Sequence, residues 1–266
     1  MFPFNLPKRL LPVLLFSLLT GYRGLGQPPA TKPILTVYAG DCVSKILPVV
    51  GVALRRMTGI KVQFKFAPTA ELAGAVEKKA SFDLLLTEDA GIMAALAGRG
   101  LLDKSSFTDV AILPLILAAE PEKMPIVEMR RGFDLSAAIK GKILLVSPAM
   151  GPEGAAAKQA LEHLGWLEAL KPRLGTVPDG RSAVALVDKG AADAAIIYAS
   201  DLAFSQSLEK AAEFPAETHD PIILTAALSA KAPPSARRFL TFLLEPTAQG
   251  YLNNAGLAPV SKAKTN

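Results

Sequence analysis

The chain has 266 residues, half of them apolar, so it can bury a large core and is long enough for one large domain or two smaller ones. Its formal net charge is +5, and loss of residues 1–26 would remove three basic residues and no acidic one, leaving +2. A surface so nearly balanced argues against nucleic acid as a partner, because nucleic-acid binders carry a strongly basic face.

The first 26 residues have the three-part pattern of a secretory signal. A basic pair precedes an apolar run, Leu10 to Leu19, and two small residues precede a predicted cut before Gln27. The run is about half the roughly 20 residues that a membrane-spanning helix needs. No cysteine lies near the cut, so a lipid anchor of the usual bacterial kind is not expected. The pattern therefore predicts a signal peptide over residues 1–26 and a periplasmic or extracytoplasmic protein.

After a proline-rich spacer, short apolar runs alternate with segments of helical periodicity, which is typical of βα units around a largely parallel sheet. Thr69 is predicted as an N-cap, and Pro48 is expected to move the start of the first helix to about Lys45. The predicted strands and helices of this first part alternate, beginning with a strand: Ile34–Ala39, Ile46–Met57, Ile60–Phe66, Glu71–Lys79, Phe82–Thr87 and Asp89–Ala97.

The middle of the chain repeats this order. Val110–Ala119 is predicted as one strand crossing into a second lobe, with an irregular segment, Pro121–Asp134, after it. The elements then expected are a strand at Ile143–Val146, a loop at Ser147–Gly154, a helix at Ala155–Leu164, a loop at Pro172–Asp179, a helix at Arg181–Lys189 and a strand at Ala194–Tyr198.

The last part of the chain is expected to return to the first lobe. A strand is predicted within Pro221–Leu228, a helix over Ser235–Leu244 and a final turn near Tyr251. These expectations assign residues 31–112 and 218–262 to lobe 1 and residues 113–217 to lobe 2. Two lobes of matching construction imply a cleft between them.

Four loops should meet at that cleft, because ligands of open parallel sheets collect beyond the carboxyl ends of the strands. Helix N-termini there present N–H groups and positive dipole ends to a small anion without any basic side chain. The four loops are Gly40–Ser44, Pro68–Ala70, Pro148–Gly154 and Pro178–Arg181.

A set of short motifs runs in fixed order through the chain: Val37-Tyr38-Ala39, Phe66-Ala67 with Leu72-Ala73, Asp83 to Asp89, Gly154 with Ala157 to Leu161, Arg181 with Ala183 and Ala185 to Val187, and Ile196 to Asp201. In this order, the chain from about Leu35 to Leu257 resembles the periplasmic molybdate-binding proteins of ABC importers. The resemblance implies an α/β, type II periplasmic binding protein with two lobes, two crossing segments and an interlobe cleft.

The resemblance also implies a function. The protein would be a monomer that binds molybdate or tungstate and delivers it to an ABC permease driven by its ATPase, with no cofactor and no catalytic residue. Closure would be a hinge motion about the segments near Val110–Leu117 and Pro215–Leu224.

The ligand residues that the resemblance implies are Cys42, Thr69, Glu153, Gly180 and Tyr198. Thr69 and Tyr198 can donate from hydroxyls, and Gly180 can donate from its backbone N–H. Cys42 stands where a serine is usual, and a thiol is a weaker donor than a hydroxyl. Glu153 stands where a small apolar residue is usual, and Asp41 adds a second carboxylate. Two carboxylates facing a dianion repel it unless they point away or are protonated.

These departures leave several alternatives open. Asp41 can simply interact with helix N–H groups, and Cys42 can be a small packed residue. Alternatively, Asp41, Cys42, Met150 and Glu153 can form a transition-metal site, or Glu153 can join the coordination sphere of a metal oxyanion. A small organic solute with a cationic or hydrogen-bond-donating end would also suit carboxylates. The alternative of another class is a hydrolase with Cys42 as nucleophile and His219 as base, although the second glycine of a nucleophile elbow is missing.

Overall fold

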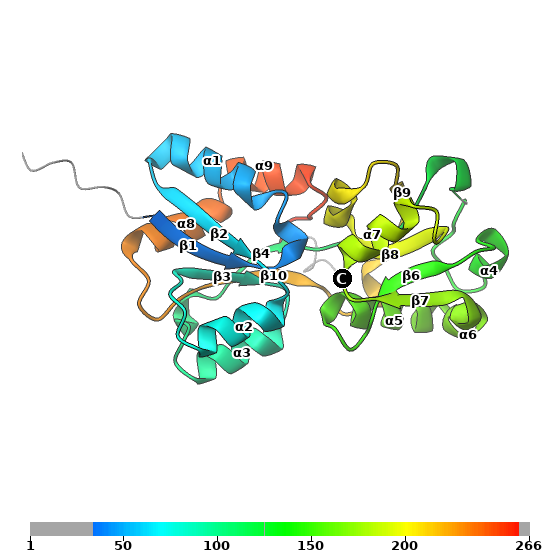
Figure 1. The fold of residues 1–266 in the computed structure, drawn as a ribbon, viewed down its shortest axis with the longest axis horizontal. Helices are drawn as coiled ribbons and strands as arrows, with labels where there is room; N and C mark the ends of the chain where they lie inside the picture. The colour runs from blue at the N-terminus through cyan, green and yellow to red at the C-terminus, as the bar shows by residue number, and fades with distance from the viewer. Residues whose placement is uncertain (1–33, 125, 261–266) are drawn as a thin grey trace, which may run out of the picture. The chain divides into compact units, whose positions relative to one another are not determined.

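Two five-stranded mixed sheets organise the chain, and each is flanked by helices in one of two lobes (Figure 1). The computed structural model describes residues 34–124 and 126–260. The predicted signal peptide and its cleavage site lie outside these residues.

The first sheet takes strands from both ends of the described chain. Its order is β2-β1-β3-β10-β4, with β1 parallel to β2 and β3, and β10 antiparallel to β3 and β4. The bounds are Ile34–Ala39 for β1, Lys61–Phe66 for β2, Leu84–Thr87 for β3, Thr108–Ile112 for β4 and Ile223–Leu228 for β10. The prediction that the chain returns to complete the first lobe with a late strand is therefore confirmed.

The second sheet is contiguous in sequence and has the order β7-β6-β8-β5-β9. Strands β6, β7 and β8 are parallel, and β5 runs antiparallel to β8 and β9. The bounds are Leu115–Ala119 for β5, Ile143–Val146 for β6, Leu174–Val177 for β7, Ala194–Tyr198 for β8 and Glu209–Glu213 for β9. Both edge strands differ from the sequence prediction, which placed a loop over β7 and no strand at β9.

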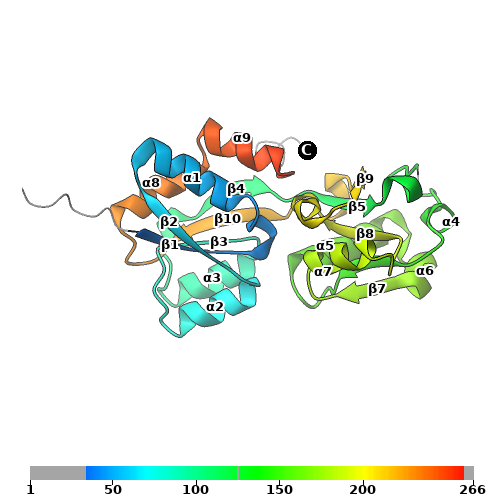
Figure 2. The same cartoon turned by 45° about the horizontal axis from the view of Figure 1, so that its top comes forward.

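Helices cover both faces of each sheet. Helices α2 and α3 pack on one face of the first sheet, and α1, α8 and α9 pack on the other (Figure 2). In the second lobe, α5 and α7 pack on opposite faces. The bounds are Leu47–Thr58 for α1, Thr69–Glu77 for α2, Ala90–Gly98 for α3, Leu135–Ala138 for α4, Pro152–Leu164 for α5, Leu167–Leu170 for α6, Gly180–Asp188 for α7, Pro234–Leu243 for α8 and Pro246–Asn254 for α9.

None of these helices, in the described part of the chain, has both the length and the apolar character needed to cross a membrane. The buried faces of these helices are formed by the periodically spaced apolar residues of the sequence. Leu72 and Val76 of α2, for example, are buried one turn apart against the sheet.

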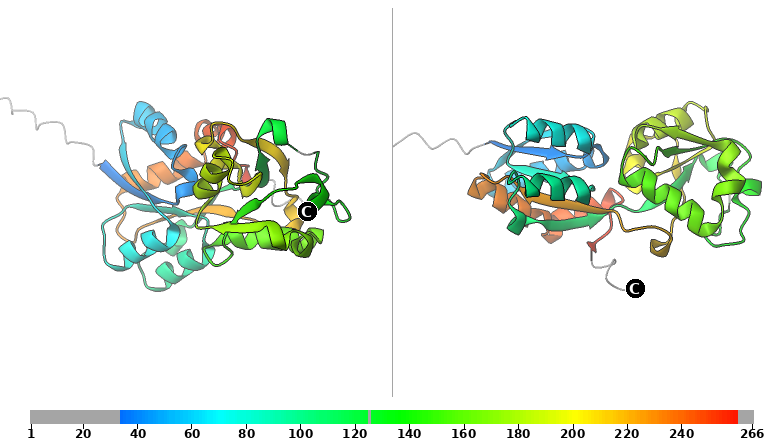
Figure 3. Two further views of the ribbon diagram at one scale, coloured as in Figure 1. Left: turned by 45° about the vertical axis from the view of Figure 1, so that its right-hand side comes forward. Right: turned by 90° about the horizontal axis from the view of Figure 1, so that it is seen from below.

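Two segments connect the lobes, and they run beside each other (Figure 3). The predicted single strand Val110–Ala119 is in fact two strands, β4 and β5, which are interrupted at Leu113 and Pro114. Proline has no backbone N–H to donate to a sheet ladder, so it favours such a break. The return segment follows β9, and the N–H of Leu113 donates to the carbonyl of Ile222 at 2.9 Å.

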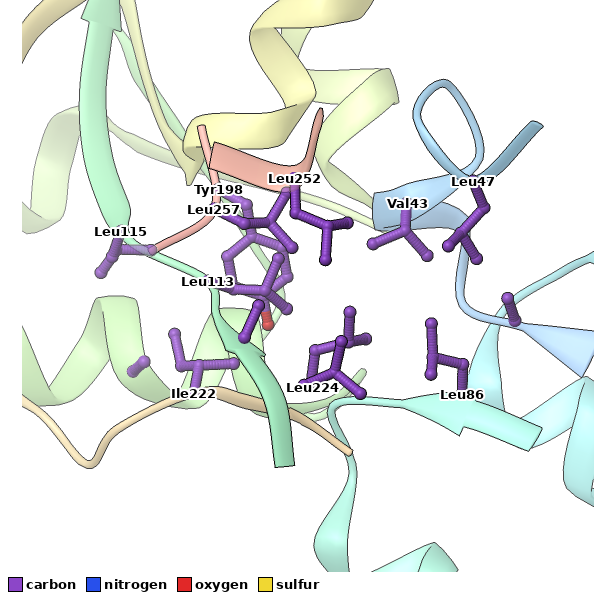
Figure 4. Close-up of a cluster of buried hydrophobic side chains, with 14 of the residues drawn as sticks. Val43, Leu47, Leu86, Leu113, Leu115, Tyr198, Ile222, Leu224, Leu252 and Leu257 are labelled. Carbon is purple, nitrogen blue, oxygen red and sulfur yellow. The ribbon is translucent and has the colours of Figure 1, made fainter. Parts of the chain in front are cut away.

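The apolar core continues through this junction (Figure 4). Leu113 and Ile222 of the connecting segments lie among buried side chains of both lobes, including Leu252 and Leu257 after α8 and the ring of Tyr198. Tyr198 therefore has a fixed position, because its ring is packed at the point where the two lobes join.

Candidate functional site

A cleft of about 350 Å³ is lined by residues of both lobes. All four loops predicted to meet there contribute to its lining, as do the turn between β3 and α3 and the 3-10 segment Ala199–Phe204 that follows β8. The residues singled out by the sequence that line it are Asp41, Cys42, Thr69, Met150, Glu153, Gly180 and Tyr198.

The first loop differs from its prediction. Residues Asp41–Val43 form a separate 3-10 turn, and α1 begins only at Leu47, with Ile46 as its N-cap. Pro48 lies in the first turn of α1, where a missing N–H costs nothing, so the helix does not begin at Lys45. The N-terminus of α1 is thus not one of the helix ends at the cleft.

Cys42 is held by a carboxyl from the neighbouring strand end. Its Sγ donates to Glu88 Oε2 at 3.7 Å. A Cβ built at Gly40 would lie 2.9 Å from the same Glu88 oxygen, so glycine is what allows the carboxyl to reach the first loop. Burial raises the pKa of the Cys42 thiol, and the negative charge of Glu88 raises it further, so the thiol stays neutral.

Thr69 is the first residue of α2, and the predicted N-cap role belongs instead to Pro68. The Thr69 hydroxyl lies 2.7 Å from that of Thr87, which is fully buried at the end of β3. The Thr87 hydroxyl also accepts from the N–H of Asp89 at 3.2 Å. When Thr87 donates to Thr69, the Thr69 proton is free for a ligand.

Two of the helices that begin at the cleft are capped by aspartates, and two are not. Asp89 accepts from the N–H of Ile92 at the start of α3, and Asp179 accepts from the N–H of Ser182 at the start of α7. The N-caps of α2 and α5 make no side-chain hydrogen bond. The starts of α2 and α5 therefore carry no side-chain cap, and the caps of α3 and α7 engage the third N–H of each helix rather than the first, so positive helix ends remain for an anion.

Glu153 lies in the first turn of α5. The residue before the helix, Gly151, has a φ of +150°, a conformation that favours glycine. Helix α5 starts at Pro152, three residues earlier than predicted, because proline suits the first position of a helix. The Glu153 carboxylate accepts from the N–H of Tyr198 at 3.3 Å, which draws it toward the end of β8.

Gly180 fits between two carboxyl groups. A Cβ built there would lie 2.2 Å from Asp201 Oδ2 and 3.0 Å from Glu153 Oε1. Only a residue without a side chain can hold this position while both carboxyls remain in place. The sequence pointed to the Gly180 backbone, and the structure adds the reason for a glycine there.

Tyr198 is 1% exposed, and its hydroxyl makes no hydrogen bond to any residue that the structure describes. Asp201 is also buried, and its Oδ2 makes no hydrogen bond to any described residue. Buried polar atoms are nearly always hydrogen-bonded. These two atoms, in residues that line the cleft, are therefore suited to contact a ligand.

The electrostatics of the cleft are acidic. Burial raises the pKa of Asp201 from 3.8 to about 7, against the lowering effects of the Tyr198 N–H and Arg181. Burial also raises the pKa of Glu153 well above its ordinary value, and the charge of Asp201 adds to this effect. The pKa of Glu88 is raised by burial as well. These three carboxyls are therefore much more easily protonated than ordinary ones.

Charged and aromatic side chains also link the lobes at the edge of the cleft. Arg181 of α7 forms an ion pair of 2.5 Å with Asp41 of the first loop. The guanidinium of Arg181 and the ammonium of Lys45 each lie 5.1 Å from the centre of the Phe204 ring. Asp41 is thus turned toward a cation, and its charge is partly balanced.

The metal and hydrolase alternatives gain no support from this geometry. Met150 is 59% exposed, and the described residues contain no group of three or more His, Cys, Asp or Glu side chains placed to hold a metal ion. His219 lines hollows other than the one that Cys42 lines. A thiol with a raised pKa is also a poor nucleophile.

Glu88, Asp201 and the pairing role of Arg181 were not predicted. All three belong to motifs that the sequence displays, Asp83 to Asp89, Ile196 to Asp201 and Arg181 with Ala183. Glu88 and Asp201 follow strands β3 and β8, and Arg181 lies at the start of α7. These ends of strands and helices face the cleft, so position in the chain could have identified all three residues.

Comparisons with known proteins agree with this architecture. The family model described as bacterial extracellular solute-binding protein matches residues 35–258. The molybdate-binding protein ModA of Haemophilus influenzae is 28% identical over 88% of this chain and 94% of its own length. ModA of Escherichia coli strain K12 is 25% identical over 73% of this chain and 76% of its own.

A solved structure shows the same fold. The substrate-binding domain of a putative molybdenum ABC transporter from Clostridium difficile superposes with a TM-score of 0.73 at 21% identity. The match covers 85% of this chain and 99% of that domain. The two-lobed α/β fold predicted from the sequence is thereby confirmed.

Proposed function

Because the chain belongs to the family of bacterial extracellular solute-binding proteins, we propose that it is the solute-binding component of an ABC importer for molybdate or the related oxyanion tungstate. The two ModA relatives support the ligand class, since each is named as a molybdate-binding protein and each aligns over most of this chain. The importer would supply the permease and ATPase to which the ligand passes.

The observation that carries the proposal is the unpartnered, buried hydroxyl of Tyr198 in a cleft where α2 and α5 begin without side-chain caps. A small oxyanion there accepts from the Tyr198 and Thr69 hydroxyls and from backbone N–H groups near Gly180. The Cys42 thiol is already donating to Glu88 and contributes less. We therefore assign ligand contacts to Thr69, Gly180 and Tyr198, with Glu153 beside them.

The remaining assignments follow the same proposal. Lobe 1 comprises residues 31–112 and 218–262, lobe 2 comprises residues 113–217, and the lobes close as a hinge about the connecting segments. The protein acts as an exported monomer in the periplasm, after removal of residues 1–26. A site built from fixed donors lowers the cost of ordering the closed state.

One observation favours a second ligand class. The carboxyls of Glu88, Glu153 and Asp201 line one cleft, and ionised carboxyls suit a small organic solute with a cationic or hydrogen-bond-donating end. Such a solute would use the same cleft and the same hinge. A small organic cation is therefore one of the ligands to be measured.

The test is a melting and calorimetry panel on the mature protein with molybdate, tungstate, sulfate, phosphate and a small organic cation. A ligand at 100 times its dissociation constant raises the free energy of unfolding by about 2.7 kcal/mol. We expect this response from molybdate and tungstate. A response to the cation alone, with none to any oxyanion, would contradict the proposal.

Tyr198→Phe sharpens the test because it removes only the hydroxyl and keeps the packed ring. A hydrogen bond to a charged group contributes about 1.5–3 kcal/mol, so molybdate should bind roughly 10 to 100 times more weakly. The matched control is Tyr251→Phe in α9, which is outside the cleft lining and should bind as the unmodified protein does.

A further inference from the structure

Three carboxyl groups of the cleft, those of Glu88, Glu153 and Asp201, have no ion-pair partner among the described residues. Arg181, the basic residue of the cleft lining, is paired with Asp41 instead. Asp201 is 4% exposed, and Glu88 and Glu153 are half-buried. The carboxyls therefore face the space where the proposed oxyanion binds, without a neutralising cation of their own.

The other charged and titratable groups of the cleft come from every element packed against it. None of them supplies a cation to the three carboxyls. Asp89 and Asp179 each accept a backbone hydrogen bond that caps a helix, α3 and α7 respectively. Cys42 donates to Glu88, and the Tyr198 hydroxyl is unpaired. The full set is Asp41, Cys42, Glu88, Asp89, Glu153, Asp179, Arg181, Tyr198 and Asp201.

Glu153 and Asp201 form a close pair. Both lie against Gly180, where a Cβ would be 3.0 Å from Glu153 Oε1 and 2.2 Å from Asp201 Oδ2. Glu153 accepts from the N–H of Tyr198, and Asp201 Oδ2 has no partner. Two ionised carboxylates so near each other repel, and a dianion beside them would repel both. A proton on either carboxyl turns a repulsive acceptor into a donor.

Resting on the proposed function, we propose that the cleft binds its oxyanion together with protons, with Glu153 and Asp201 neutral and donating hydrogen bonds to the anion. Each carboxylate that donates takes one proton from solvent, and no covalent bond of the ligand changes. The Tyr198 hydroxyl and the Asp201 carboxyl then gain the partners that they otherwise lack. Glu88 accepts from the Cys42 thiol, and its neutral form removes the third carboxylate charge that has no ion-pair partner.

The ionisation of the free protein fits this arrangement. Burial raises the pKa of Asp201 to about 7, so a dianion has only to complete a protonation that is already partial at neutral pH. Burial raises the pKa of Glu153 and the charge of Asp201 raises it further, so the pair holds a proton more readily than either carboxyl alone. Asp41 and the capping aspartates keep their own partners throughout.

Isothermal titration calorimetry with molybdate tests the proposal. Titrations at pH 8, where Asp201 is mostly ionised in the free protein, should show uptake of about one proton or more per molybdate bound when buffers of different ionisation enthalpy are compared. Between pH 7 and 9, where molybdate itself stays fully deprotonated, the dissociation constant should rise up to about tenfold per pH unit for each proton taken up.

The variants Asp201→Asn and Glu153→Gln replace a titrating carboxyl by an amide of the same shape that donates at every pH. Each should flatten the pH dependence and bind molybdate more tightly than the unmodified protein at pH 9. The control is Glu162→Gln, an exposed residue of the same helix as Glu153, which should keep the full pH dependence.

Two results would overturn the proposal, and they are distinguishable. Molybdate binding with the same affinity from pH 6 to 9, and no buffer dependence of the heat, would overturn proton-linked binding alone. No binding of any oxyanion at any pH would overturn the proposed function as well. The titrations of the unmodified protein decide the matter even if one variant fails to fold.

Discussion

At the scale of the residue, the main chemical property of the cleft is that its carboxyls ionise reluctantly. Asp201 is buried without a cation of its own, and burial shifts its pKa from 3.8 to about 7. The folded protein therefore binds a proton at this position over a pH range in which the unfolded chain does not. Stability and ligand binding are both linked to that proton.

We predict that this carboxyl makes the unliganded protein less stable as pH rises. Its stabilising contribution is complete below the unfolded pKa and is lost as pH rises through about 7. Each pKa unit corresponds to about 1.4 kcal/mol, so the loss is on the order of 4 kcal/mol at most. Between pH 5 and pH 8, the melting temperature of the unmodified protein should therefore fall relative to that of Asp201→Asn.

The control for this comparison is again Glu162→Gln, since an exposed residue gives no such trend. A constant difference between Asp201→Asn and the unmodified protein across the whole range would show that Asp201 is ionised in the folded state at pH 5. Calorimetric unfolding in the absence of any oxyanion is required, because a bound ligand would contribute its own pH dependence.

At the scale of the element, the start of α7 is fitted to its surroundings by one glycine. Gly180 brings the helix backbone against Asp201 and Glu153, and an added Cβ would overlap the Asp201 carboxyl. Backbone and carboxyls therefore share the space that a side chain would fill. This close approach sets the position of the first N–H groups of α7 relative to the cleft.

We predict that Gly180→Ala weakens molybdate binding at least tenfold and destabilises the fold by about 1–3 kcal/mol, because Asp201 must move. The matched control is Gly74→Ala in α2, where a Cβ meets nothing within 4 Å. That change should stabilise by about 0.5–1 kcal/mol, since glycine is unfavourable inside a helix. Thermal melts and calorimetry measure both. Equal effects of the two changes would contradict the account of Gly180.

The elements also show what the sequence can predict. Strands β1, β6 and β8 have the bounds expected from their apolar runs, because they are central and buried. Edge strands β7 and β9 escaped prediction, since β9 has the polar sequence Glu-Lys-Ala-Ala-Glu and is largely exposed. Edge strand β2 was predicted, since its sequence Lys-Val-Gln-Phe-Lys-Phe keeps the alternation that β9 lacks.

The cleft was only partly predictable for a related reason. The carboxyl ends of parallel strands meet at one edge, so the loops bearing Thr69 and Tyr198 could be placed together from their order alone. The proximity of Glu88 to Cys42, and of Asp201 to Gly180, depends on packing between segments far apart in sequence. The ionisation of these carboxyls depends on that packing, so it could not be predicted from local sequence patterns.

At the scale of the whole molecule, the two lobes are linked on one side by connecting segments and at the cleft edge by Asp41, Lys45, Arg181 and Phe204. The ion pair between Asp41 and Arg181 is partly exposed, so it contributes about 0–1 kcal/mol. The Lys45 ammonium of lobe 1 lies over the Phe204 ring of lobe 2 and contributes about 0.5–1 kcal/mol, whereas the contact of Arg181 with the same ring lies within lobe 2. These small terms favour the arrangement in which the lobes are together.

We predict that Phe204→Leu shifts the free protein toward open forms and weakens molybdate binding by about two- to fivefold, the equivalent of the roughly 0.5–1 kcal/mol of the contact with Lys45. Small-angle scattering of the unliganded variant should give a larger radius of gyration, and saturating molybdate should restore it. Phe107→Leu, a partly exposed phenylalanine of the first lobe, is the control. Unchanged scattering and affinity in Phe204→Leu would contradict a role in holding the lobes.

The placement of β10 has a consequence for how the chain acquires its fold. Strands β5 to β9 follow one another, so the second sheet can assemble as soon as its own stretch of chain is free. The first sheet cannot, since β10 lies between β3 and β4 and is the strand on which β4 is hydrogen-bonded. The sheet of lobe 1 is therefore complete only once residues 223–228 are available, and their insertion between β3 and β4 is its long-range step.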